Sequence, residues 1–147
     1  MKSILILNGP NLNFLGKRDP VHYGTLTLDE INGRLTDLAK QLEVELRFAQ
    51  SNKEGVLIDL LQEATGWADG VVFNPGGYSH TSIAIRDAVE SIGLPVIEVH
   101  LSNIYAREEF RHNSMVSPVC AGTIAGLGWR SYTSALTALK GILDDQP

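Results

Sequence analysis

Three short apolar runs in the sequence end in side chains that can exchange protons or bind polar ligands. The runs are residues 4–7, 71–73 and 96–99, the last of which is interrupted by Glu98. They lead directly into Asn8, Asn74 and His100, so each run ends in an amide or an imidazole. Short, mainly apolar runs, above all the unbroken one at 71–73, are typical of strands buried on both faces of a parallel sheet. Because ligands bind beyond the carboxyl ends of such strands, we expect the three ends to form one shared site.

The candidate general base is Tyr23, which lies in a long polar loop after the first run, five residues after Arg18. A tyrosine in water titrates near ~10, so a tyrosine that acts as a base at neutral pH needs help. Neighbouring arginines favour the phenolate, and Arg18 and Arg111 can supply that positive charge. The plainer interpretation is an exposed loop tyrosine beside a solvated arginine, and spacing alone favours neither.

His100 is the matching candidate for a proton donor, because an imidazole titrates near neutrality. Glu98 lies two residues earlier, on the same side of the strand, and can orient the imidazole ring. The backbone amides of Leu101 and Ser102 follow at the strand end and can hold a carboxylate. On spacing alone, a structural histidine bonded to a backbone carbonyl is the more frequent case.

Other polar residues near these strand ends offer further contacts. Hydrogen-bond donors and acceptors come from Asn74, His80 and Arg111. Without further information, we interpret Arg86 and Asp87, early in the third helix, as a surface ion pair that contributes little to stability. The residues expected to stay mostly solvated are Arg107, Glu108 and Glu109.

Composition and missing motifs narrow the class of protein. The formal net charge of −5 argues against a nucleic-acid-binding face, and no apolar run approaches the roughly 18 residues of a membrane helix. A single cysteine, Cys120, fits a reducing compartment, and the start of the chain does not resemble a signal segment, so we expect a cytoplasmic protein. The sequence has no dinucleotide-binding glycine motif, no P-loop, no zinc spacing and no acidic magnesium cluster. An acid–base site without a metal or organic cofactor is what remains.

Apolar periodicity predicts five strands that alternate with helices. The strands are expected at 3–7, 44–50, 71–74, 95–100 and 119–125. Capping boxes at 27–30 and 51–54 precede the first two helices. Two more helices are expected, at 82–92, which Thr81 can cap, and at 127–143. One helical turn is expected near 106–110. This alternation predicts one α/β domain over residues 1–147, a parallel sheet with helices on both faces. The flavodoxin-like strand order 2-1-3-4-5 is the natural choice.

Several motifs, in the same order, resemble those of the type II 3-dehydroquinate dehydratases, the small dehydroquinases of the shikimate pathway. The motifs are NGPNLN at 8–13, LG at 15–16, Arg18, YG at 23–24, NPG at 74–76, Tyr78, HTS at 80–82, RDA at 86–88, IEVHLSN at 97–103 and REEFR at 107–111. The resemblance runs from about residue 4 to about residue 139, nearly the whole chain. Any one motif is weak, but the full ordered set is specific.

The resemblance implies an anti elimination of water from 3-dehydroquinate to 3-dehydroshikimate through an enolate, with no metal or organic cofactor. The implied catalytic residues are the base Tyr23, Arg18 beside it, the acid His100, and Asn11, which with a bound water faces the enolate. The implied substrate-binding residues are Asn74, His80, Leu101, Ser102 and Arg111. Asp87 is implied to reach a neighbouring subunit's site, in a homododecamer built from four trimers.

Three positions depart from the commoner pattern of that family. They are Asp19, Gly77 and Ser79, where Glu, Ala and Thr are expected. Each keeps the type of chemistry, although Gly77 can loosen its turn, so substrate affinity is the property most affected.

Two alternatives remain open. A non-catalytic flavodoxin-like binding module would reveal itself as a yellow, flavin-bound protein. A lyase or isomerase for another hydroxylated keto acid would be detected by competition between dehydroquinate and sugar acids.

Overall fold

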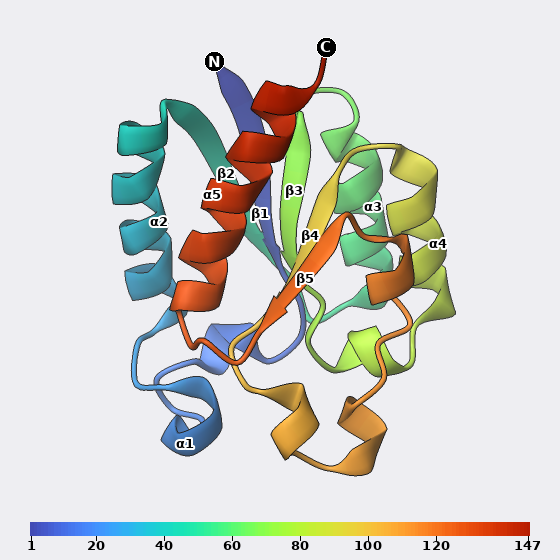
Figure 1. Ribbon diagram of the computed structural model, residues 1–147. Helices are drawn as coiled ribbons and strands as arrows, with labels where there is room; N and C mark the ends of the chain where they lie inside the picture. The colour runs from blue at the N-terminus through green and yellow to red at the C-terminus, as the bar shows by residue number, and fades with distance from the viewer.

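The computed structural model describes residues 1–147 and contains one five-stranded, all-parallel sheet (Figure 1). Its strands are β1 Lys2–Asn8, β2 Val44–Gln50, β3 Gly70–Asn74, β4 Val96–His100 and β5 Gly122–Ala125. Their spatial order is β2-β1-β3-β4-β5, which confirms the predicted flavodoxin-like arrangement. Each of the first four strands is followed by a crossover that returns the chain to the same end of the sheet, as parallel pairing requires.

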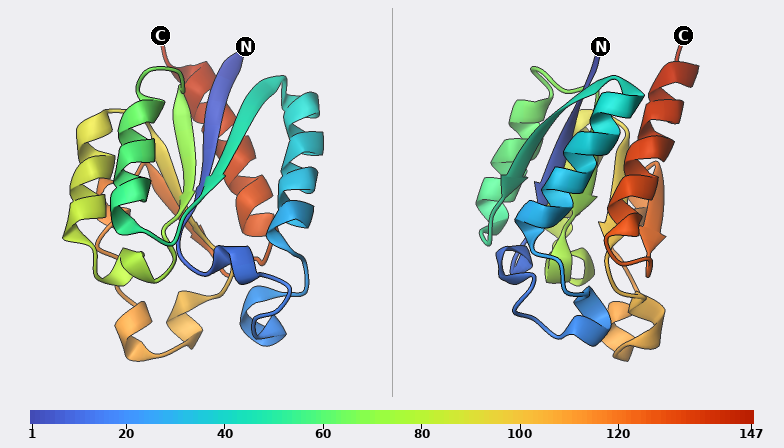
Figure 2. Two further views of the ribbon diagram at one scale, coloured as in Figure 1. Left: turned by 180° about the vertical axis from the view of Figure 1, so that it is seen from behind. Right: turned by 90° about the vertical axis from the view of Figure 1, so that its left-hand side faces the viewer.

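Four helices cover the two faces of the sheet (Figure 2). They are α2 Leu28–Leu42, α3 Glu54–Ala64, α4 Ile83–Ile92 and α5 Arg130–Asp145. Helices α2 and α5 pack together on one face, and α3 and α4 on the other. Each face has its own apolar core, and β1 feeds both because Ile4 and Ile6 point to one while Leu5 and Leu7 point to the other. The predicted burial of the central strands on both faces is therefore confirmed.

The carboxyl ends of the strands lie at one edge of the sheet, where the short helix α1 Pro20–Tyr23 and several 3₁₀ turns gather (Figure 1). Asn8 and Asn74 are register partners at the ends of β1 and β3. Immediately beyond them, the backbone N–H of Gly9 donates to the Asn74 carbonyl at 2.8 Å. A Cβ on Gly9 would lie 2.6 Å from the Pro75 carbonyl oxygen, so the two strand ends can approach this closely only because residue 9 is glycine.

One of the two predicted capping boxes is present, and the other prediction is wrong. Thr27 accepts from the Glu30 N–H while the Glu30 carboxylate accepts from the Thr27 N–H, which starts α2 as expected. Ser51 does not cap α3, because its backbone N–H still pairs with the Asn8 carbonyl and extends the edge of the sheet. Its hydroxyl accepts instead from the Lys53 N–H at 3.0 Å, and α3 begins at Glu54 without a side-chain cap.

Helix α4 is capped by Ser82 rather than by Thr81, since the Ser82 hydroxyl accepts from the Ile85 N–H at 3.0 Å. At the other end of the chain, helix α5 begins at Arg130 and not at residue 127. Gly126 and Gly128 adopt positive φ angles of 89° and 59°, so the turn before α5 is not helical.

Irregular segments account for the other differences from the sequence prediction. Strand β5 begins at Gly122 because residues 117–119 form a 3₁₀ turn around Pro118. The single turn expected near 106–110 is two separate 3₁₀ turns, at 104–106 and 109–111. The long loop after β1 holds a 3₁₀ turn at 12–14 and helix α1, neither of which was predicted. None of the helices in the protein has both the length and the apolar character needed to cross a membrane.

Candidate active site

A pocket opens at the carboxyl edge of the sheet and collects side chains from the ends of β3 and β4 and from the loops that follow β1, β3 and β4. The pocket is lined by Pro10, Asn11, Leu12, Arg18, Tyr23, Asn74, Gly76, Gly77, His80, His100, Leu101, Ser102, Ile104, Arg107 and Arg111. Only four of these 15 residues are hydrophobic, so the pocket suits a small, strongly polar ligand. No three His, Cys, Asp or Glu side chains lie together as metal ligands would.

Tyr23 ends helix α1, and two guanidinium groups lie close to its ring. Asp19 caps this helix by accepting from the Val21 N–H at 3.0 Å. The Cζ of Arg18 lies 3.8 Å from the centroid of the Tyr23 ring, and the Cζ of Arg107 lies 5.0 Å from it. Both distances are within the range of a cation–π contact, so two positive charges lie near the phenol.

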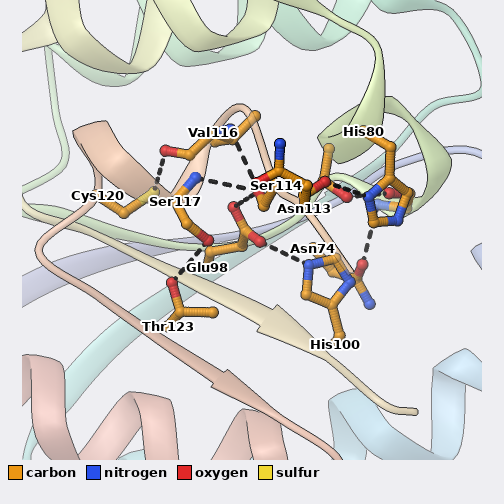
Figure 3. Close-up of polar contacts among 12 residues, drawn as sticks. Asn74, His80, Glu98, His100, Asn113, Ser114, Val116, Ser117, Cys120 and Thr123 are labelled. Atoms are coloured by element: carbon orange, nitrogen blue, oxygen red, sulfur yellow. Dashed lines mark hydrogen bonds and ion pairs between the residues drawn. The ribbon is translucent and has the colours of Figure 1, made fainter. Parts of the chain in front are cut away.

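His100 is joined to a buried carboxylate at the end of β4 (Figure 3). Its Nε2 lies 2.6 Å from Oε2 of Glu98, whose side chain is fully buried. The other carboxylate oxygen of Glu98 accepts from the Ser114 hydroxyl at 2.9 Å. Ser114 itself accepts from the N–H groups of Val116 and Ser117, so its proton is directed at Glu98.

His80 stacks near His100, with ring centroids 6.3 Å apart and planes inclined by 20°. Nδ1 of His80 lies 2.8 Å from the Asn113 carbonyl, and because a carbonyl only accepts, Nδ1 carries a proton. Nε2 is therefore the nitrogen of His80 that is left for a ligand. The two imidazoles and Asn74 face the same pocket (Figure 3).

Asn74 lies at the end of β3, and its side chain is fixed by two hydrogen bonds. Its Oδ1 accepts from the Gly76 N–H at 3.0 Å, and its Nδ2 donates to the Tyr132 hydroxyl at 2.8 Å. Tyr132 donates in turn to Oδ1 of Asn8 at 2.5 Å. Burial raises the pKa of Tyr132 far above its ordinary value, although the Asn74 hydrogen bond opposes this effect, so its hydroxyl keeps its proton.

The predicted carboxylate-binding residues lie on one wall of the pocket. Leu101 and Ser102 are both buried directly after β4, and Arg107 donates through Nη1 to the Ser102 hydroxyl at 3.3 Å. Arg111 pairs through Nε with Glu108 at 2.6 Å. Backbone and Arg111 hydrogen bonds lower the pKa of the exposed Glu108, so this carboxylate stays charged at the rim.

Most of the predicted site residues line this pocket, but Glu98 and Asp87 do not. Glu98 lies behind His100. Asp87 is exposed on α4, away from the pocket of its own chain. The interpretation of Arg86 and Asp87 as an ion pair is wrong, because Arg86 donates instead to the Met115 carbonyl at 2.9 Å.

Three residues that support the site are not expected from the sequence. Arg107 was expected to be solvated, but its side chain is only 9% exposed and lies over Tyr23. Its Nε is buried without a hydrogen-bond partner and lies 3.9 Å from the Glu108 carboxylate. Ser114 and Tyr132 were missed because their partners come from distant segments. Nothing in the local sequence pointed to Arg107, because its contact with the loop that carries Tyr23 exists only in the folded protein.

Comparison with known proteins agrees with this geometry. The family model described as dehydroquinase class II matches residues 2–140. The 3-dehydroquinate dehydratase of Pelotomaculum thermopropionicum is 57% identical over 139 residues, which cover 95% of this chain and 96% of that protein. The 3-dehydroquinate dehydratase of Bacillus licheniformis is 58% identical over 137 residues, covering 93% and 94%. The crystal structure of the type II dehydroquinase from Butyrivibrio crossotus matches with a TM-score of 0.91 and 46% identity, covering 94% of this chain and 97% of that one. The chain therefore belongs to the class II dehydroquinase family.

Proposed function

We propose that the protein is a 3-dehydroquinate dehydratase, a hydro-lyase of the shikimate pathway that needs no metal or organic cofactor. The observation that carries the proposal is one pocket lined by Tyr23 and His100, each with its own charged partner. An anti elimination needs a base and an acid that act on one substrate, and the fact that both residues line this pocket supports the proposal.

The first step is removal of the proton beside the ketone of 3-dehydroquinate. In this proposal the Tyr23 phenolate takes the proton, and the electron pair of the broken C–H bond forms an enolate. Arg18, 3.8 Å from the ring centroid, attracts the negative charge that the base must carry. Asn11, which lines the pocket, faces the enolate together with a bound water and offsets its charge.

The second step is loss of the hydroxyl group. The enolate re-forms the ketone, its electrons make the new carbon–carbon double bond, and the carbon–oxygen bond breaks. His100 donates a proton to the departing oxygen, so that water leaves and 3-dehydroshikimate remains. Nε2 of His100 is engaged by Glu98, so Nδ1 is the ring nitrogen from which this proton comes.

The remaining pocket residues hold the substrate in this orientation. Asn74, His80 and Arg111 bind the ring hydroxyls, and the backbone amides of Leu101 and Ser102 bind the carboxylate. The proposal extends to a homododecamer of four trimers in which Asp87 reaches a neighbouring subunit's site; light scattering measures that mass. We also expect the enzyme to work in the cytoplasm.

The test is an assay with 3-dehydroquinate after treatment with a chelator. The expected result is a new conjugated-enone absorbance that Tyr23→Phe abolishes while the circular dichroism spectrum stays unchanged. Tyr105→Phe is the control, because Tyr105 is 68% exposed and does not line the pocket. Turnover of another hydroxylated keto acid in preference to dehydroquinate, or full activity in Tyr23→Phe, would refute the proposal.

A further inference from the structure

A chain of hydrogen bonds below the pocket connects helix α5 to two strand ends. It runs from Gly76 through Asn74 and Tyr132 to Asn8. Tyr132 is 0% exposed, Asn8 1% and Asn74 3%, so water cannot replace a lost partner without rearrangement. Tyr132 and Asn8 do not line the pocket, whereas Asn74 does. These hydrogen bonds therefore join the buried face of α5 to a residue that lines the pocket.

The direction of every hydrogen bond in this chain is determined. The Gly76 N–H can only donate, so the atom of Asn74 that faces it at 3.0 Å is the carbonyl oxygen Oδ1. The amide nitrogen of Asn74 must then face Tyr132, whose oxygen accepts at 2.8 Å. Having accepted, the single proton of the Tyr132 hydroxyl goes to Oδ1 of Asn8.

This arrangement leaves one N–H of the Asn74 amide without a partner among these hydrogen bonds. The Asn74 amide has two N–H groups, one of which donates to Tyr132. Since Asn74 lines the pocket, the second N–H is the group available to a ligand oxygen. Rotation of the amide by half a turn would offer an acceptor at that point, and would set an amide N–H against the Gly76 N–H.

We propose that Tyr132 is a positioning residue for the substrate site, whose buried hydroxyl fixes the Asn74 amide so that its free N–H donates to a substrate hydroxyl. The proposal rests on the proposed function for the identity of that substrate. A tyrosine suits this position because its hydroxyl both accepts and donates, and because its ring fills the core between α5 and the sheet. Because burial raises the pKa of Tyr132, its hydroxyl keeps the proton that it donates in the hydrogen bond to Asn8.

The deciding variant is Tyr132→Phe, which removes the hydroxyl alone. Binding of the substrate hydroxyl contributes equally before and during the reaction, so we expect KM to rise about tenfold while kcat stays within about twofold. A purely structural role would lower the amount of active protein and hence kcat, with KM unchanged. Leu136→Val is the matched control, because it removes one buried methylene a turn further along α5 and is expected to leave KM unchanged.

A second variant and a second measurement keep the test decisive. Asn8→Ala deletes the acceptor at the other end of the chain without touching α5, and it is also expected to raise KM. Crystal structures of the wild type and of Tyr132→Phe test the position of Asn74 without any activity assay. We expect Asn74 to lose its hydrogen bond with the Gly76 N–H in the variant. An inactive wild type would reject the proposed function, and the position of Asn74 would still decide the role of Tyr132. An unmoved Asn74, or an unchanged KM in both variants of an active enzyme, would overturn the proposal.

Discussion

The guanidinium of Arg18 lies against the face of the Tyr23 ring, with its Cζ 3.8 Å from the ring centroid. Both residues belong to the loop after β1, where helix α1 brings together positions that are five residues apart. The loop therefore carries the phenol and one of its cations as a unit, while the second cation, Arg107, comes from beyond β4. Movement of the loop would carry Tyr23 and Arg18 together relative to His100, which is anchored on the sheet.

Arg18→Met tests the role of that cation. The substitution removes the charge but keeps much of the length of the side chain, so the base loses the nearer of its two positive neighbours. We expect kcat to fall roughly tenfold or more, measured by enone absorbance with saturating 3-dehydroquinate. The matched control is Arg34→Met, which removes a guanidinium 4.3 Å from the Trp129 ring, outside the pocket. Equal activity of both variants would show that the Arg18 charge does not assist the base.

Ser114→Ala tests the contact that holds Glu98. Without the hydroxyl, one oxygen of a fully buried carboxylate loses its 2.9 Å hydrogen bond, and the N–H groups of Val116 and Ser117 lose their acceptor. We expect kcat to fall about tenfold, because Glu98 no longer holds His100 in one orientation and a hydrogen bond to a charged group contributes about 1.5–3 kcal/mol.

KM should change little in Ser114→Ala, because Ser114 does not line the pocket. Thr123→Val is the control, since it also removes a hydroxyl near this cluster, one that is exposed and bonded to Ser117. A kcat as high in Ser114→Ala as in Thr123→Val would contradict the role given to Ser114.

The elements that position the site were predictable, because local patterns determine them. The apolar run before Asn74 and the one before His100 each identify a buried strand and the side chain at its end. The support of these side chains was not predictable in the same way. Tyr132 fits the apolar stripe of α5, and nothing in its neighbourhood shows that its hydroxyl meets residues 58 and 124 positions away.

For Arg107 the prediction from sequence, namely a solvated side chain, is wrong. It stands in the charged run Arg107-Glu108-Glu109, which is typical of a solvated segment, and Glu108 is indeed 54% exposed on its side chain. Two short 3₁₀ turns in this segment bury the arginine against Tyr23 and Ser102 while the carboxylates stay outside. The placement depends on contact with the loop after β1, which local sequence does not reveal.

Gly9→Ala tests the close approach of the two strand ends. The added Cβ would meet the Pro75 carbonyl oxygen at 2.6 Å, so the backbone after β1 or β3 must shift. We expect the free energy of unfolding to fall by about 1–3 kcal/mol, measured by chemical denaturation. Gly33→Ala is the control inside α2, where no atom outside the helix's own backbone and the two neighbouring residues lies within 4 Å of the new methyl group.

The Gly33→Ala variant should be stabilised by roughly 0.5–1 kcal/mol, because alanine restricts the unfolded chain and favours the helix. The opposite signs of the two changes make the comparison independent of any general effect of a glycine-to-alanine substitution. A Gly9→Ala protein as stable as Gly33→Ala would mean that the two strand ends can separate freely.

Cys120 provides a test of pH dependence. Burial, with a smaller contribution from the nearby Glu98 charge, raises the pKa of its thiol from the ordinary value of 9.0 to about 12. The folded protein therefore keeps the thiol proton at pH values where the unfolded chain loses it. The resulting contribution to stability is fully present below pH 9.0 and is lost as the pH rises towards about 12.

The thiolate is the reactive form, so alkylation by iodoacetamide at pH 8 should be at least about a hundredfold slower in the folded protein than in guanidinium. Mass spectrometry of the modified chain at successive times measures both rates. The unfolded sample is the internal control for reagent quality, because it contains the same single cysteine. Fast modification of the folded protein at pH 8, with its circular dichroism spectrum intact, would show that the thiol is neither buried nor held in its protonated form.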